Sequence, residues 1–225
     1  MLLSSVQEVK KIYSALTSLP ETAFGEEGKH IQELCPRLAE QYDDSDPGIL
    51  VALITMNYLV LEAGESLYIP ADGIHAYLAG DIIECMARSN NVLNTGFCPR
   101  ADRNNIELFI SCLTFTPHSA GESMLRPKTY PRSLKGKSIL YAPPLSEFDM
   151  LQTSLEAGEK EILKGFEGPA VFVATKGNAA LKANGKVYNV REGSVFFVAH
   201  GTELELESLE GGFLMHTAFV EGGTE

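Results

Sequence analysis

Positive charge is scarce in this chain: 18 lysines and arginines stand against 30 aspartates and glutamates in 225 residues, a formal net charge of −12 at pH 7. Nucleic acids and anionic membrane surfaces are bound by clustered lysines and arginines, so this balance argues against both as partners. It does not exclude a phosphorylated small molecule, for which one local basic pocket is enough. Ordinary solubility explains the acidity equally well.

A long apolar run is also missing. Nowhere do about 18 apolar residues follow one another, and residues 1–19 are amphipathic rather than continuously apolar. The sequence therefore predicts neither a signal peptide nor a membrane span.

Cysteine is sparse, and no two cysteines have Cys-x-x-Cys spacing. Each of the four lies in an apolar context: Cys35, Cys85, Cys98 and Cys112. We expect buried, reduced thiols rather than disulfides or a zinc–thiolate site, and a cytoplasmic location.

The first part of the chain has helical periodicity. Apolar side chains recur every three or four positions over residues 3–19 and again over 31–42, which predicts two amphipathic helices. Residues 50–56 are apolar on all sides and fit either a buried helical turn or a strand. Residues 58–61 and 67–69 flank an Ala-Gly-Glu turn and predict a hairpin.

The last third of the chain reads as β structure. After a buried element at 106–115 and a long connection at 117–137, short strand-like runs lie at residues 148–155, 170–174, 179–182, 186–190, 195–198, 203–209 and 213–220. Asn184-Gly185 between two of these runs is a strong hairpin signal. Many short strands at regular spacing predict a sandwich or barrel, here of jelly-roll type.

The stretch from Gly64 to Arg100 concentrates the chemically active side chains. Gly64, Pro70, Gly73 and His75 follow a glycine–strand–proline turn–histidine order that is close to the second half of the cupin metal motif. The spacing differs slightly from the strict motif, so a hydrogen-bonded core histidine stays open as the alternative.

Two carboxylates follow the histidine. If the segment is a strand, Tyr77 and Asp81 share the face of His75, whereas Glu84 needs a bend that Gly80 can supply. A carboxylate here suits proton transfer beside a metal-bound sugar. It suits an ion pair with a surface lysine equally well.

The run HAYLAGDIIECMARSNN followed by GFCPR resembles the type I mannose-6-phosphate isomerases. LVLEAGESLYIPADGIHAY is similar to the family's approach to its metal histidine, and FEGPAVFVATKGNAALKANG to its C-terminal cupin domain. The resemblance covers essentially the whole chain. It implies a mainly β, cupin-type jelly-roll fold with an N-terminal helical segment. Residues 1–48 would be the remnant of a helical insertion, 49–120 part of the catalytic cupin domain, and 121–225 a connection and the C-terminal cupin domain.

The resemblance implies a zinc-dependent isomerase with one Zn²⁺ ion. Such an enzyme interconverts mannose 6-phosphate and fructose 6-phosphate through a cis-enediol, and it supplies mannose for GDP-mannose and glycan synthesis. Its partner would be a small sugar phosphate, with no nucleic acid or membrane, and the complete protein would be a cytoplasmic monomer.

Carried over residue by residue, His75 falls on the family's last metal ligand and Glu84 on its active-site glutamate. Tyr77 lines the same pocket, and Asp81 is placed with it as a substrate-binding residue. Arg100 falls where the family usually has a lysine, and it can hold a phosphate or sugar oxygen with a planar fork.

Asn94 departs from the family pattern. It lies two residues before the Gly-Phe dipeptide, at the position of the family's catalytic arginine. Loss of one such donor costs roughly 100- to 1000-fold in rate, unless Arg88, Arg100 or Arg103 replaces it.

The family's Gln-x-His pair and further glutamate ligand have no counterpart in this sequence. A catalytic zinc needs about three protein ligands, and His75 is one. We therefore expect a truncated part of an isomerase that neither turns over substrate nor binds zinc well. The alternative is a non-catalytic cupin module that binds a sugar phosphate or a protein partner, with Asn94 marking lost catalysis. A cupin oxygenase or epimerase is disfavoured by the single ligand.

Overall fold

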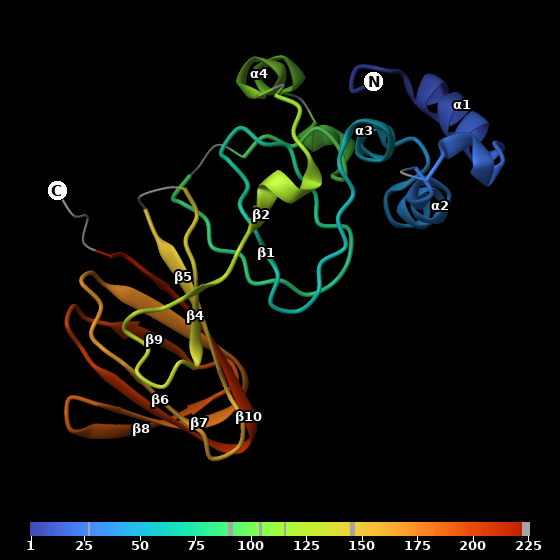
Figure 1. The fold of residues 1–225 in the computed structure, drawn as a ribbon. Coiled ribbons are helices and arrows are strands. Elements are labelled where there is room, and N and C mark those ends of the chain that lie inside the picture. The colour runs from blue at the N-terminus through green and yellow to red at the C-terminus, as the bar shows by residue number, and fades with distance from the viewer. Residues whose placement is uncertain (27, 90–91, 104, 115, 145–146, 222–225) are drawn as a thin grey trace. The chain divides into compact units, whose positions relative to one another are not determined.

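The structure is a computed structural model, and it describes residues 1–26, 28–89, 92–103, 105–114, 116–144 and 147–221. The chain divides into two compact units. The first comprises residues 1–61, 69–80 and 89–123, and the second comprises residues 62–68, 81–88 and 124–225. Figure 1 shows the opening helices in blue and the strands of the large sheet in yellow to red.

The first unit is mainly helical. Its α-helices are α1 (Val6–Thr17), α2 (His30–Tyr42), α3 (Pro47–Thr55) and α4 (Ile106–Cys112), and its 3-10 helices are η1 (Glu21–Phe24), η2 (Arg100–Asp102) and η3 (Ala120–Ser123). The two amphipathic helices predicted from apolar periodicity are confirmed as α1 and α2. The all-apolar run at 50–56 belongs to a helix, which decides between its two interpretations.

Two local signals set where these helices begin. The Ser5 hydroxyl accepts from the Glu8 amide at the start of α1, and the Glu8 carboxylate accepts from the Ser5 amide in return. Asp46 caps α3, and Pro47 occupies its first turn. The buried side chains of α2 and α3 then form one small core: Leu34, Cys35, Leu38, Ile49 and Leu53.

The hairpin predicted for 58–61 and 67–69 is wrong. Residues 58–61 form no strand, and β1 (Ser66–Leu67) pairs instead with β2 (Met124–Leu125), far along the chain. A strand needs ladder hydrogen bonds to a neighbour, and a short apolar run beside a turn does not choose that neighbour.

The second unit is built on an antiparallel sheet of eight strands. Their order is β3-β4-β5-β10-β7-β8, with β6 paired to β10 and β9 paired to β7. The strands are β3 (Lys128–Thr129), β4 (Ser138–Tyr141), β5 (Asp149–Leu155), β6 (Lys160–Leu163), β7 (Ala170–Ala183), β8 (Lys186–Arg191), β9 (Val195–Val198) and β10 (Leu204–Phe219). Figure 1 shows the sheet curling on itself.

The predicted strands are largely present, but their ends differ. The runs at 170–174 and 179–182 are one strand, β7, and the runs at 203–209 and 213–220 are one strand, β10. Register shifts in the β7–β10 ladder let both strands continue through their glycines. Strands β3, β4 and β6 were not predicted, and β3 lies in the stretch expected to be a connection. The Asn184-Gly185 hairpin is confirmed, with φ of 50° and 73°.

Alternate residues of the long strands face one core. Phe172 of β7, Met215 and Phe219 of β10, and Leu151 of β5 are fully or almost fully buried. This two-residue period is what a sheet with one covered face requires. All four cysteines are free thiols as predicted, although Cys35 alone is buried and Cys112 is exposed. In the described part of the chain, no helix is long and apolar enough to cross a membrane.

Asp149, at the start of β5, makes the stability of the second unit depend on pH. Burial raises the pKa of its carboxyl above the usual value, and the nearby Glu221 raises it further. Since the folded pKa lies above the unfolded one, the contribution of this group to stability is full at low pH and is lost as pH rises through the folded pKa. We expect Asp149→Asn to raise the free energy of unfolding at about pH 7 and to leave it unchanged at about pH 3. Urea unfolding at both pH values checks this, and an equal effect at both would contradict it.

Candidate functional site

His75 and Tyr77 lie close together in the first unit. Their rings meet edge to face, with centroids 5.7 Å apart, and both side chains are exposed. The exposure contradicts the core-histidine alternative. Nδ1 of His75 lies 3.0 Å from the carbonyl oxygen of Gly73. With the proton on Nδ1, the lone pair is on Nε2, which is the arrangement of many metal-ligating histidines.

The strand expected to carry these residues is absent. The described residues from 74 to 89 form no strand, so alternation does not put Tyr77 and Asp81 on the face of His75. The bend expected at Gly80 is present, with φ of 103°. Asp81 and Glu84 are exposed and belong to the second unit, whereas His75 and Tyr77 belong to the first.

The remaining predicted site residues lie in the first unit. Asn94 is exposed, and it is followed by the buried Thr95. Arg100 begins η2, and its side chain lies outside the described residues, as do Asn90 and Asn91 of the Ser-Asn-Asn triplet.

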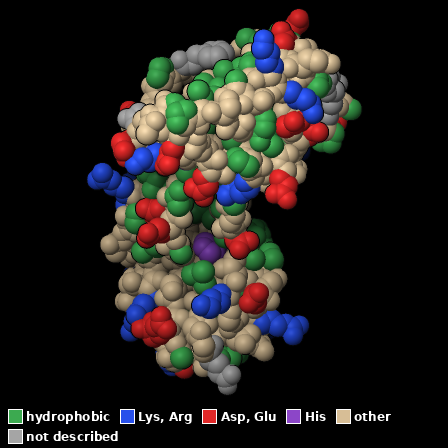
Figure 2. Space-filling view, turned by 90° about the vertical axis from the view of Figure 1, so that its right-hand side faces the viewer, with side chains coloured by type: hydrophobic (Ala, Val, Ile, Leu, Met, Phe, Trp, Pro, Cys, Tyr) green, Lys and Arg blue, Asp and Glu red, His purple; other side chains and the backbone are tan. Residues whose placement is uncertain are grey.

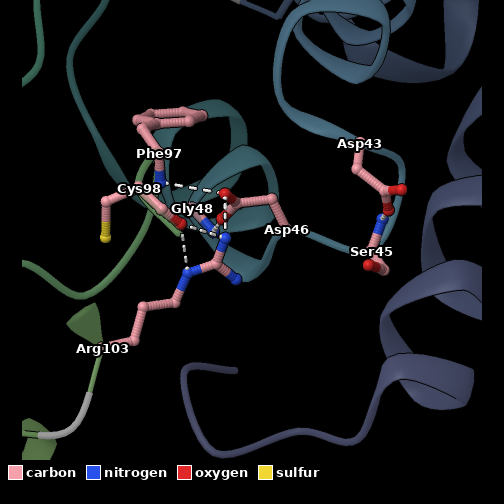
Figure 3. Close-up of polar contacts among 7 residues, drawn as sticks. All are labelled: Asp43, Ser45, Asp46, Gly48, Phe97, Cys98 and Arg103. Carbon is pink, nitrogen blue, oxygen red and sulfur yellow. Dashed lines mark hydrogen bonds and ion pairs between the residues drawn. The ribbon is translucent and has the colours of Figure 1, made fainter. Parts of the chain in front are cut away.

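Arg103 is engaged by an ion pair and by a backbone carbonyl. Its Nη2 lies 2.7 Å from Oδ2 of Asp46, its Nε donates to the carbonyl of Cys98 at 2.9 Å, and its side chain is 14% exposed. Figure 3 shows Arg103 and Asp46 pointing toward each other beside the backbone of Phe97 and Cys98. The structure therefore gives no support to Arg103 as the substitute for the arginine that Asn94 replaces.

This ion pair borders a cavity that sequence reasoning did not find. The cavity has a volume of about 480 Å³ and lies within the first unit. Its lining residues are Gln41, Tyr42, Asp43, Ser45, Asp46, Phe97, Cys98, Pro99 and Arg103. The Asp-Pro-Gly sequence at 46–48 is a helix-start signal that would have marked Asp46 as a cap, but nothing in it shows the burial of the carboxylate.

The described side chains supply only part of a zinc site. Within the described ranges, no three histidine, cysteine, aspartate or glutamate side chains come together as a metal site. His75 has suitable chemistry for one ligand, and a catalytic zinc takes about three from the protein. The described residues therefore do not by themselves fit the ion.

Charge on the visible surface is mixed. On the face that Figure 2 shows, lysines and arginines stand singly among acidic side chains. On this face, a phosphate would be held by individual cations rather than by a basic field.

Comparison with known proteins gives the family. Residues 138–186 match the family model for the C-terminal region of type I phosphomannose isomerase. The mannose-6-phosphate isomerase of Saccharomyces cerevisiae is 37% identical over 194 residues, which cover 85% of this chain and 44% of that protein. The Aspergillus fumigatus mannose-6-phosphate isomerase is 34% identical over 98% of this chain and 49% of its own length. The chain belongs to the type I mannose-6-phosphate isomerase family.

Solved structures of the family share the fold. A zinc-bound mannose 6-phosphate isomerase superposes with a TM-score of 0.71 at 19% identity, over 98% of this chain and 56% of that one. The apo form from Salmonella typhimurium gives a TM-score of 0.69. The predicted fold class is confirmed: mainly β, of cupin jelly-roll type, with an N-terminal helical segment. The chain spans about half the length of the curated relatives it matches.

Proposed function

We propose that this chain is the C-terminal part of a mannose-6-phosphate isomerase and contributes to its substrate site. The observation that carries the proposal is the sequence match to isomerases. Because the Aspergillus fumigatus match covers 98% of the chain, it includes the segment from Gly64 to Arg100. The substrate class is a hexose 6-phosphate, and the reaction moves a proton between C1 and C2 through a cis-enediol.

Each residue of the segment has a proposed role. The carboxylate of Glu84 takes and returns the proton. The guanidinium of Arg100 holds the phosphate or a sugar oxygen through paired N–H donors. Tyr77 and Asp81 hydrogen-bond the sugar hydroxyls, and Nε2 of His75 is available to a metal.

One Zn²⁺ ion, when bound, would supply charge stabilisation to the sugar oxygens. It needs ligands in addition to His75, because the described residues do not complete a metal site. We further propose that the whole enzyme is a cytoplasmic monomer that supplies mannose 6-phosphate to GDP-mannose and glycan synthesis.

Zinc content and turnover of the purified 225-residue chain test this assignment. We expect less than one zinc per chain and no turnover, since one ligand is too few, and His75→Ala to weaken the residual zinc binding. His118→Ala is the matched control, because His118 is also an exposed histidine of the first unit whose Nδ1 faces the carbonyl two residues before it. One zinc per chain together with turnover would refute the proposed division of the site, and equal effects of both substitutions would refute the role of His75.

Asn94 favours a second candidate, a non-catalytic cupin module that binds a sugar phosphate. An amide donates a hydrogen bond but carries no charge, so it is a weaker partner for a developing oxyanion than a guanidinium. Mannose 6-phosphate binding without turnover in the protein purified from its source would support the module, and turnover there would exclude it.

A further inference from the structure

Asp46 is a buried carboxylate with more partners than a helix cap needs. It is 1% exposed, and its Oδ1 accepts from the amide of Gly48 at 2.8 Å, which caps α3. Its Oδ2 accepts from the amide of Phe97 at 3.0 Å and from Arg103 at 2.7 Å. Both of these donors lie more than fifty residues farther along the chain. Asp46 therefore joins the start of α3 to a distant segment (Figure 3).

Hydrogen bonds hold the backbone on both sides of Arg100. Before it, the carbonyl of Cys98 accepts from Nε of Arg103, which closes the chain between residues 98 and 103 into a loop. Inside that loop, the amide of Asp102 donates to the carbonyl of Pro99 at 2.9 Å and forms the turn of η2. Asp46 holds this loop through Arg103 at one end and through Phe97 at the other.

Two further contacts bring the same segment against α2 and α3. A Cβ added to Gly96 would lie 2.6 Å from Cα of Gly48, so the two backbones touch without room for a side chain. The ring of Phe97 packs on Tyr42, with centroids 4.7 Å apart. The segment that begins at Gly96 therefore packs against α2 and α3, and the carboxylate of Asp46 is the buried charge at this contact.

We infer that Asp46 is a positioning residue that sets the place of Arg100 for a phosphate monoester. The inference rests on the proposed function, in which Arg100 holds the phosphate of a hexose phosphate. A guanidinium binds phosphate through a fixed fork, so a displacement of its backbone misaligns both hydrogen bonds. In Asp46→Asn the charge is lost and one acceptor oxygen becomes an NH2 donor, so the single remaining oxygen cannot serve both Gly48 and the pair formed by Phe97 and Arg103. The loop then loses its charged anchor.

The test compares four forms of the 225-residue chain by NMR titration with mannose 6-phosphate and with inorganic phosphate: wild type, Asp46→Asn, Arg100→Ala and the double variant. Asp43→Asn is the matched control, because Asp43 is an exposed carboxylate of the same turn that accepts from the Ser45 amide instead. We expect Asp46→Asn to weaken sugar-phosphate binding about 10-fold in the wild type and less than about 2-fold in the Arg100→Ala background. Asp43→Asn is expected to change it less than about 2-fold.

A purely structural role predicts a different pattern. It lowers the melting temperature but leaves the affinity of the folded chain unchanged, or it weakens binding equally with and without Arg100. Either result overturns the inference. If Asp46→Asn does not fold, Arg103→Lys keeps the charge facing Asp46 but lacks the fork to Cys98, and it is expected to weaken binding in the same Arg100-dependent way. No effect of Arg103→Lys on binding then overturns the inference.

Failure of the proposed function gives a separate result. In that case, the wild-type chain does not bind mannose 6-phosphate, or Arg100→Ala leaves its binding unchanged. Both outcomes remove Arg100 as the phosphate ligand and the inference with it. Binding that needs Arg100 but is unaffected by Asp46→Asn overturns the inference alone.

Discussion

Replacing Glu161 with leucine is expected to lower the free energy of unfolding of the second unit by about 3–4 kcal/mol. Glu161 lies on β6 and is fully buried. Its carboxylate accepts from the hydroxyl of Ser133 at 2.5 Å, from the amides of Lys135 and Lys137 at 2.9 and 2.7 Å, and from the hydroxyl of Ser138 at 3.3 Å. One side chain thus holds the whole turn that leads into β4.

The size of this effect follows from the hydrogen-bond donors that would lose their acceptor. Each hydrogen bond to a charged group contributes about 1.5–3 kcal/mol, and a donor left without its acceptor costs about 1–3 kcal/mol. These terms are not additive, so the total stays below their sum. Leucine fills the space but accepts nothing.

Glu207→Leu is the matched control. Glu207 is a partly exposed carboxylate on β10 whose partner is Lys160, at 3.0 Å. A surface ion pair of this kind contributes about 0–1 kcal/mol, so a change of about 0.5 kcal/mol is expected. The chain has no tryptophan, so far-UV circular dichroism in urea is the suitable measurement. Equal losses for the two substitutions would show that Glu161 does not hold the turn.

Gly177→Ala is expected to cost about 2–4 kcal/mol in the free energy of unfolding. Gly177 lies inside β7 with φ of 75°, and a Cβ there would lie 1.9 Å from the carbonyl oxygen of Gly212 on β10. That oxygen belongs to backbone and has no rotamer through which to move aside. Alanine therefore requires the backbone to move where the β7–β10 pairing changes register.

Gly185→Ala is the control that measures the cost of the backbone conformation without a steric clash. Gly185 has almost the same φ, 73°, but a Cβ there meets nothing within 4 Å. Its substitution is expected to cost about 1–2 kcal/mol, the penalty for placing a side chain in the left-handed region. Urea unfolding of both variants checks the difference. Equal losses would mean that the β10 backbone yields freely at Gly212.

Local signals in the sequence determined the local structure well. Apolar periodicity gave α1 and α2, and Asn184-Gly185 gave the hairpin between β7 and β8, because both depend on side chains within a few residues. The motif order from His75 to the Gly-Phe-Cys-Pro-Arg run gave the family, which the relatives confirm. The roles of Glu84, Asn94 and Arg100 stay predictions.

Only the tertiary structure decided the features that need a distant partner. The apolar run at 58–61 predicted a strand, but it has no ladder partner there, while Ser66–Leu67 pairs with residues some sixty positions later. The sequence predicted two short strands where β7 lies and two where β10 lies, but pairing between β7 and β10 carries both strands through their glycines. The burial of Asp46 depends on Phe97 and Arg103, which lie more than fifty residues farther along the chain. Strand pairing, burial and ion pairing join residues far apart in the chain, and periodicity and spacing act only between near neighbours.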